Sequence, residues 1–247
     1  CESVVHTCSE NQIETEFYHL DERLEVQYPK GQLPEGVYLY LVSYYGQLSD
    51  DRILEYKKLY GNIIVDHTHA FFQRPLKGID TLYSCRKFWG VSDGAYLSTD
   101  TKLTENNTPD YSEDRMKHIL GRYEQDAGTY YKDMLANAAK YEGMELRQMS
   151  RLTQNLLKAV DYETAKAKRE ENYRILSELL PSENIFNQII PEGPFAYPYF
   201  HANGMELRRR LAAKKIFVPT YWKNILESCE RDSLEYIWAA DILPLPC

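Results

Sequence analysis

Two short apolar runs on either side of a helical stretch constrain the fold of this chain more than any other feature. The runs read "VYLYLV" (residues 37–42) and "IIV" (residues 63–65), and such continuous runs are typical of strands covered on both faces of a parallel sheet. Between them, "SDDRILEYKKLYG" offers Ser49 as a helix cap, acidic residues in the first turn and Gly61 as a stop. A strand, helix, strand unit of this kind predicts an α/β fold.

Further strands are predicted on both sides of this unit. Short runs rich in β-branched or aromatic residues and bounded by Gly, Asp or Asn are typical of strands. Such runs are "SVVHTC" (3–8), "EFYHLD" (16–21), "DTLYSCRKF" (80–88) and "GAYLSTD" (94–100). We therefore expect residues 1–108 to form part of a large α/β domain with a mostly parallel sheet and flanking helices.

The second half of the chain has a different pattern. Residues 111–144 and 145–180 are rich in Lys, Glu, Leu and Ala, with Pro181 as a stop, and this predicts long connecting helices over residues 109–181. After that stop we expect a small C-terminal α/β domain over residues 182–247. Its predicted elements are a strand at "GPFAYPYF" (193–200), a helix at "NGMELRRRLAAKK" (203–215) capped by Asn203, and a strand at "IFVPTYW" (216–222).

Charge and composition limit the class of protein. The net charge of −8 and the isoelectric point near 5.4 argue against nucleic acid as a main partner, because neutralising phosphates requires a basic face. No apolar stretch reaches the roughly 18 residues needed to cross a bilayer, and the first residues lack the pattern of a signal peptide. The odd count of 5 cysteines without a C-x-x-C spacing favours reduced thiols. We expect a cytoplasmic protein without a membrane partner.

The stretch "NIIVDHTHAFF" (62–72) places polar side chains directly after the second apolar run. Ligands of parallel sheets bind at the carboxyl ends of strands, so Asp66, His67 and His69 are expected at a functional edge. On a continuing strand, His67 and His69 would point to one face and start a metal site, although such a site needs further ligands and the other histidines form no second pair. The alternative is the polar end of a buried strand, with the histidines bonded to backbone.

A lysine follows the next predicted strand. Within residues 80–100, Ser84 and Lys87 come at the strand end, downstream of Asp66 on the preceding strand. A lone Lys87 would be a surface lysine in most proteins. Beside a hydroxyl and opposite an aspartate, however, a lysine can form a Schiff base with pyridoxal 5'-phosphate, while the aspartate keeps the pyridinium nitrogen protonated.

The order "LVSYYGQLSDDRILEYKKLYGNIIVDHTHAFF" and then "YSCRKFWGVSDGAYLSTD" resembles the DegT/DnrJ/StrS aminotransferases, which are fold type I pyridoxal phosphate enzymes. The resemblance implies that Asp66 pairs with the pyridinium nitrogen and that His69, in place of the family's glutamine, approaches the ring. It also implies that Ser84 contacts the phosphate and that Lys87 is the Schiff-base lysine. A homodimer, an amino donor and a keto sugar attached to a nucleotide are the expected partners.

The sequence departs from the family in several places. Ala95 stands where a second glycine is usual, and Ser84 lies closer to Lys87 than in the common pattern. The family's phosphate loop precedes this region, so the resemblance implies either a fragment that lacks the N-terminal part of the large domain and the extreme C-terminus, or a reduced relative. Two other functions stay open: a non-catalytic binding or regulatory module of the same fold, and a metal-dependent hydrolase built on His67 and His69.

Two further groups have both a structural and a functional interpretation. Tyr44 and Tyr45 follow an apolar run, so strand packing is the more common role, and contact with cofactor or substrate is the alternative. Arg208, Arg209 and Arg210 form a charge run, which is usually a solvated helix face and less often a site for an anionic substrate.

Overall fold

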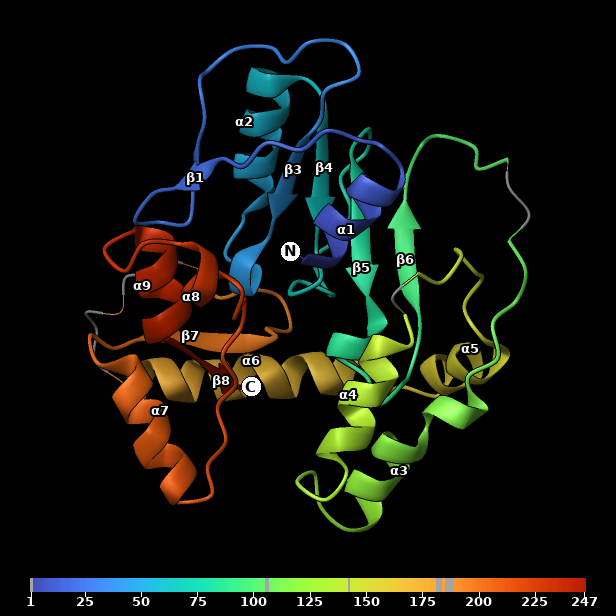
Figure 1. Ribbon diagram of the computed structural model, residues 1–247, viewed down its shortest axis with the longest axis vertical. Helices are drawn as coiled ribbons and strands as arrows, with labels where there is room; N and C mark the ends of the chain where they lie inside the picture. The colour runs from blue at the N-terminus through green and yellow to red at the C-terminus, as the bar shows by residue number, and fades with distance from the viewer. Residues whose placement is uncertain (1, 105–106, 142, 181–183, 185–188) are drawn as a thin grey trace.

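A four-stranded sheet forms the centre of the computed structural model, which describes residues 2–104, 107–141, 143–180, 184 and 189–247 (Figure 1). The strand order is β3-β4-β5-β6. The pairs β3·β4 and β4·β5 are parallel, and β5·β6 is antiparallel. The bounds are β3 (Leu39–Val42), β4 (Ile63–Asp66), β5 (Asp80–Ser84) and β6 (Ala95–Ser98). The predicted α/β class with a mostly parallel sheet is confirmed.

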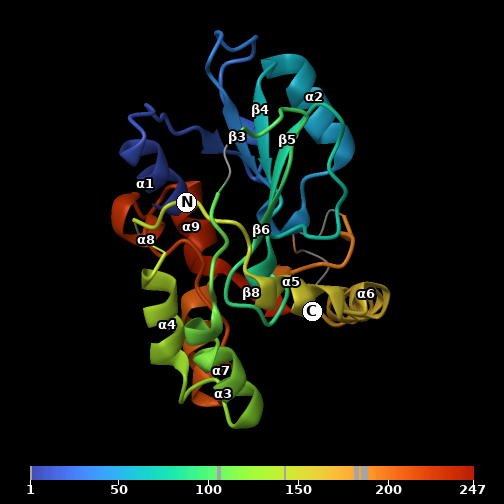
Figure 2. The same ribbon diagram turned by 90° about the vertical axis from the view of Figure 1, so that its right-hand side faces the viewer.

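The crossover helix α2 (Asp50–Tyr60) begins and ends as the sequence predicts. The Ser49 hydroxyl accepts a hydrogen bond from the Arg52 backbone N–H at 3.3 Å, and Gly61 ends the helix with φ of 79°. A side chain other than glycine would be strained at that φ. Figure 2 shows α2 on one face of the sheet and α1 (Glu2–Glu10) on the other. The sheet is therefore the middle layer of this part of the molecule.

The main core lies between the sheet and α2. Alternate strand residues are buried here, and they pack against Ile53, Tyr56 and Tyr60 of the helix. The intervening residues of β3, Tyr40 and Val42, are only partly buried. The expectation that the strands are covered on both faces therefore holds only in part for β3. The strand residues of this core are Leu39, Leu41, Ile63 and Val65.

The N-terminal predictions need correction. The stretch "SVVHTC" lies in helix α1 and not in a strand. Thr7 Oγ donates to the Ser3 carbonyl at 2.9 Å, the bond between residues four apart that a threonine makes within a helix. The stretch "EFYHLD" contributes only the two residues of β1 (His19–Leu20), which pair antiparallel with β2 (Val26–Gln27).

The two long helices predicted between residues 109 and 181 are four separate helices. They are α3 (Lys117–Glu124), α4 (Tyr131–Ala139), α5 (Arg151–Lys158) and α6 (Tyr162–Leu179). Polar caps mark the starts of α5 and α6, where Ser150 and Asp161 each accept a backbone N–H, whereas Tyr130 before α4 makes no such bond. The longest of the four, α6, has 18 residues and is therefore shorter than either predicted stretch. Pro181 lies outside the described residues. The described residues also form three short 3-10 helices elsewhere in the order of elements. η1 (Tyr44–Gly46) follows β3, η2 (Cys85–Lys87) follows β5, and η3 (Glu113–Arg115) precedes α3.

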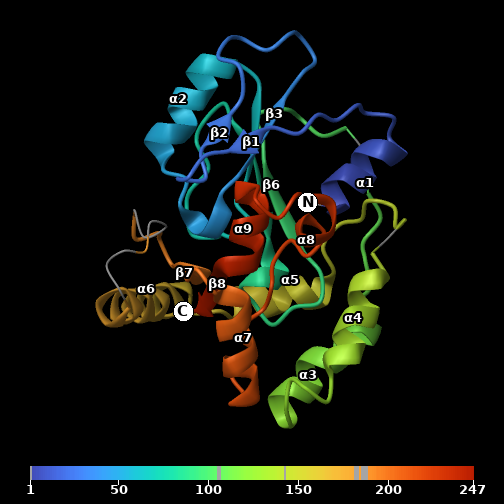
Figure 3. The ribbon, with the colours of Figure 1, turned by 60° about the vertical axis from the view of Figure 1, so that its left-hand side comes forward.

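The C-terminal part adds a third sheet, of two strands, below the carboxyl ends of β3, β4 and β5 (Figures 1 and 3). The stretch "IFVPTYW" is not a strand: Pro219 lacks a backbone donor, and Lys215 and Trp222 bend the chain with φ of 63° and 51°. The second strand of this sheet comes instead from the "ILPLP" segment, residues 242–246. The elements are β7 (Ala196–Phe200), α7 (Gly204–Ala213), α8 (Ile225–Ser228), α9 (Leu234–Asp241) and β8 (Ile242–Pro246).

The arginine run on α7 is not uniformly solvated. Arg208 donates to the carbonyls of Ala240 and Ile242 at 3.0 and 2.9 Å. It thereby satisfies backbone acceptors at the end of α9 and the start of β8, which is a structural role. Arg209 is exposed and pairs with Glu206 at 2.9 Å. In the ranges given above, no helix combines the length and apolar character needed to cross a membrane.

Candidate functional site

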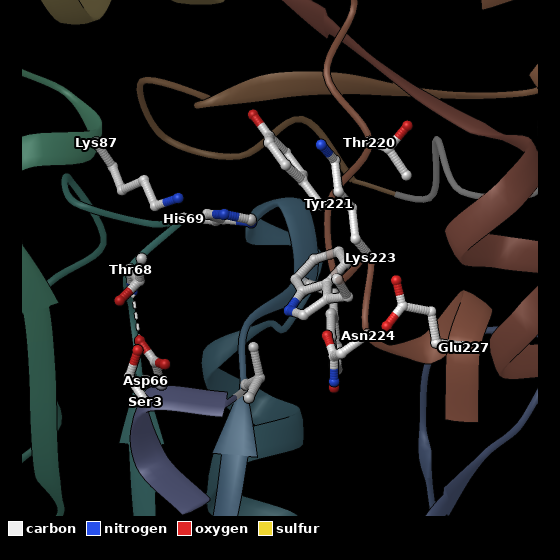
Figure 4. A pocket seen from close by; sticks show the side chains of 13 residues that line it. Ser3, Asp66, Thr68, His69, Lys87, Thr220, Tyr221, Lys223, Asn224 and Glu227 are labelled. Carbon is white, nitrogen blue, oxygen red and sulfur yellow. Dashed lines mark hydrogen bonds between the residues drawn. The ribbon is translucent and has the colours of Figure 1, made fainter. Parts of the chain in front are cut away.

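A cavity of about 460 Å³ opens at the carboxyl ends of the parallel strands, facing the C-terminal segment 220–227 (Figure 4). One wall comes from the ends of β3 and β4, from η2 and from α1. The opposite wall comes from the chain that leads into α8. The lining residues are Ser3, Val42, Tyr44, Asp66, Thr68, His69 and Lys87 on the sheet side, and Thr220, Tyr221, Trp222, Lys223, Asn224 and Glu227 on the other.

Asp66 is the last residue of β4 and is buried, with 8% of its surface exposed. Its Oδ2 accepts a hydrogen bond from the Tyr40 hydroxyl at 2.9 Å, and its Oδ1 accepts one from the Thr68 backbone N–H at 2.8 Å. Both carboxylate oxygens are thus held by the chain itself. Burial first, and then the negative charge of Asp66, raises the pKa of the Tyr40 phenol above its usual value, so this donor stays protonated.

Lys87 lies at the end of η2, three residues after the last residue of β5, and not on the strand predicted over residues 80–88. Its Nζ lies 5.5 Å from the centroid of the Tyr221 ring, which is a cation–π distance. The side chain is exposed overall, but the cavity walls displace much of its water. This desolvation, with the nearby Arg86 charge, lowers the pKa of the Lys87 amine, while Asp66 acts in the opposite direction.

His69 is enclosed by aromatic rings. The Phe195 ring stacks on it with centroids 4.7 Å apart and an angle of 21° between the planes. The rings of Tyr45, Tyr221 and Trp222 lie 5.9, 5.4 and 5.6 Å away. Burial, and then the Lys87 charge, lowers the pKa of His69 to about 3, so the imidazole is neutral at physiological pH. Its buried Nδ1 has no partner within the described part of the chain.

His67 does not share a face with His69. The strand ends at Asp66, and the two histidines lie in the turn that follows. The His67 ring packs edge to face on Tyr83, with centroids 5.4 Å apart, whereas His69 stacks on Phe195. The expected alignment of the two imidazoles is therefore wrong, because it required the strand to continue. Among the described residues, no group of three His, Cys, Asp or Glu side chains could hold a metal ion.

The other sequence candidates have different positions. Ser84 closes β5 opposite Ala95 and is not among the described side chains that line the cavity. Tyr44 lines the cavity, and Tyr45 is buried beside His69. The structure therefore brings Asp66, His69 and Lys87 to one cavity and leaves Ser84 outside it.

Sequence reasoning missed Tyr40 and the whole wall formed by residues 220–227. The stretch "PTYWKN" (219–224) contains two adjacent aromatic residues followed by a lysine and an asparagine. Interpreting it as a strand hid its role, although Pro219 in a run of this kind argues against a strand. Tyr40 gave no signal of its own, because a tyrosine in an apolar strand is ordinary packing.

No protein-family model matches this chain, and no curated protein sequence matches it significantly.

Proposed function

We propose that the chain belongs to a pyridoxal 5'-phosphate-dependent aminotransferase of fold type I that passes an amino group to a keto sugar. One observation carries this proposal: Asp66, His69 and Lys87 line the same cavity at the carboxyl ends of β4 and β5. The lowered pKa of Lys87 favours the neutral, nucleophilic amine that covalent attachment of an aldehyde requires. The resemblance to DegT/DnrJ/StrS enzymes adds support from the order of these residues along the chain.

The side chains of the cavity fit the ring end of the cofactor. Asp66 would hold the protonated ring nitrogen, since it is a buried carboxylate that already lines the cavity. His69 would contact the ring, and its neutral imidazole adds no positive charge beside the pyridinium. Lys87 would provide the covalent anchor. When bound, the cofactor supplies an electron sink for the carbanion formed at the α-carbon of the amino donor.

Two properties of the chain would serve the proton transfers of the reaction. The Lys87 amine, with its lowered pKa, can accept a proton from the α-carbon of the donor and return one to the acceptor. The aromatic rings of Tyr45, Tyr221 and Trp222 surround His69 and reduce the access of water to this side of the cavity. Lys87 therefore acts in a partly desolvated environment.

The wall opposite the sheet supports a polar, hydroxyl-rich acceptor. Thr220, Asn224 and Glu227 offer hydroxyl, amide and carboxylate groups, and Lys223 adds a cation (Figure 4). Such a mixture suits a sugar bearing an anionic group better than an apolar substrate. The homodimer and the nucleotide part of the acceptor belong to the same proposal and rest on the family resemblance.

A second candidate is a non-catalytic binding module of the same fold. The observation in its favour is that Ser84, expected at the cofactor phosphate, lies outside the described lining of the cavity. A module of this kind would keep the cavity without attaching an aldehyde to Lys87.

Absorbance spectroscopy tests the proposal. The full chain titrated with pyridoxal phosphate should gain a visible band, and borohydride should fix the cofactor mass onto the peptide that contains Lys87. Lys87→Arg, which keeps the charge but cannot form the bond, is the matched control and should show neither. No band for a folded wild-type chain would overturn the enzyme proposal, and saturable binding without a band would favour the non-catalytic module.

A further inference from the structure

Tyr40 is placed by the sheet to reach Asp66. Tyr40 in β3 pairs with Ile64 in β4, so Asp66 lies two residues further along the neighbouring strand on the same face. The Tyr40 hydroxyl spans this diagonal and donates to Asp66 Oδ2 at 2.9 Å. Behind it, the Tyr18 hydroxyl donates to the Tyr40 backbone carbonyl at 2.8 Å. The position of the Tyr40 side chain is therefore set by the pairing of β3 with β4, and not by the Tyr18 hydroxyl.

The Asp66 carboxylate is held from two sides. Tyr40 binds Oδ2, and the backbone N–H of Thr68 binds Oδ1 at 2.8 Å. Rotating the carboxylate away from this orientation would break both bonds at once. Hydrogen bonds to an ionised acceptor are stronger than those between neutral groups, so the orientation that exposes Asp66 to the cavity is favoured.

We propose that Tyr40 is a positioning residue, whose hydroxyl fixes the Asp66 carboxylate in the orientation needed to hold a cationic ring nitrogen in the cavity. This inference rests on the proposed function and adds a residue that the sequence pattern does not single out. A purely structural Tyr40 would need only its ring, which is partly buried in the sheet layer. The hydroxyl instead has a carboxylate of the cavity as its partner, and the raised pKa of the phenol keeps it a donor across the working pH range.

The test compares the affinity for pyridoxal phosphate in two matched variants. Tyr40→Phe removes the hydroxyl that binds Asp66, and Tyr18→Phe removes a hydroxyl that binds the backbone of Tyr40. We expect Tyr40→Phe to weaken cofactor binding by about tenfold, because the carboxylate that would hold the ring nitrogen loses one of the two hydrogen bonds that orient it. Tyr18→Phe should bind as the wild type does. Equal losses in both variants would mean a structural role and would overturn the inference.

Two further measurements separate positioning from folding. In a chain carrying Asp66→Ala, adding Tyr40→Phe should cause no additional loss of affinity, because the hydroxyl then has no carboxylate to orient. In the cofactor-free protein, the NMR signal of the ¹³Cζ-labelled Tyr40 ring should shift in Asp66→Ala and stay unchanged in Tyr18→Phe. The inference is overturned if Tyr40→Phe lowers the affinity further in the Asp66→Ala chain, or if the Tyr40 chemical shift does not change in Asp66→Ala.

A wild-type chain without any visible band on titration with pyridoxal phosphate overturns the proposed function and the role of Tyr40 with it. A normal band with unchanged affinity in Tyr40→Phe overturns only the role of Tyr40.

Discussion

Tyr45 and Trp222 meet edge to face with ring centroids 5.7 Å apart, and both hold positive φ angles, of 56° and 51°. Tyr45 belongs to the turn after β3, whereas Trp222 comes from the chain that leads into α8. Bulky residues rarely adopt the left-handed region, so the surrounding contacts must outweigh its cost. Both rings also contact His69. The pair joins the C-terminal segment to the sheet at the edge of the candidate site.

The positive φ of Tyr45 leads to a stability prediction. Tyr45→Gly and Tyr45→Ala both lose the aromatic contacts, but only glycine tolerates this φ without strain. We expect Tyr45→Ala to have a free energy of unfolding about 1 kcal/mol lower than Tyr45→Gly. Urea denaturation of the two variants measures the difference. Tyr44, which lies outside the positive-φ region, is the control: there alanine should be the more stable substitution.

The titration of Lys87 gives a prediction that does not depend on the cofactor. Burial and the Arg86 charge lower the pKa of the Lys87 amine, and Asp66 raises it. Arg86→Gln should therefore raise this pKa, so that a higher pH is needed to generate the neutral amine. Asp66→Asn should have the opposite effect. The rate at which an amine-reactive reagent labels Lys87, followed by peptide mass spectrometry against pH, reports both shifts. Arg74→Gln, at an exposed residue, should leave the profile unchanged.

The sequence predicted the strand, helix, strand unit well because local chemistry determines it. Ser49 caps the helix and Gly61 ends it through their own backbone and side-chain chemistry. The apolar runs on either side are buried in the core because their side chains avoid water. Asp66 and Lys87 were placed at strand ends by the same reasoning. The wall at residues 220–227 was missed because it depends on contacts between distant segments. Trp222 adopts its strained φ only where Tyr45 and His69 are packed against it, and no local pattern encodes that arrangement.

The two buried histidines predict a loss of stability in mild acid. Burial lowers the pKa of His67 to about 4 and that of His69 to about 3, from an ordinary value of 6.5. Below pH 6.5 the unfolded chain binds protons that the folded chain excludes, so stability falls as the pH drops toward these lowered values. At pH 5.5 each histidine should reduce the free energy of unfolding by about 1.4 kcal/mol relative to pH 7.5.

Single substitutions separate the two contributions. His67→Gln and His69→Gln should each remove about half of the pH-dependent loss, measured by urea denaturation at the two pH values. Thr101→Ala, at an exposed residue that does not titrate, is the control and should leave the loss unchanged. A stability that is flat between pH 7.5 and 5.5 would contradict the burial of neutral imidazoles.

Asp93 gives the last prediction, because it joins the loop before β6 to the start of α5. Its Oδ2 accepts the Ser150 backbone N–H at 2.8 Å, and its Oδ1 accepts the Ser150 hydroxyl at 2.9 Å and the Thr153 hydroxyl. Burial alone would raise the pKa of Asp93, but the hydrogen bonds from Thr153, Ser150 and Ser112 outweigh it and lower the pKa. The carboxylate is therefore stabilised in its ionised form.

Asp93→Asn should lower the free energy of unfolding at pH 7 by about 2 to 3 kcal/mol, since an amide offers a single acceptor oxygen to three donors. The stabilising effect of the carboxylate is present above its unfolded pKa of 3.8 and is lost as the pH falls below it. The difference between wild type and variant should shrink accordingly in acid. Asp100→Asn, at an exposed residue after β6, should change stability by less than about 0.5 kcal/mol. Equal stability of wild type and Asp93→Asn at pH 7 would mean that these hydrogen bonds do not hold α5 to the sheet.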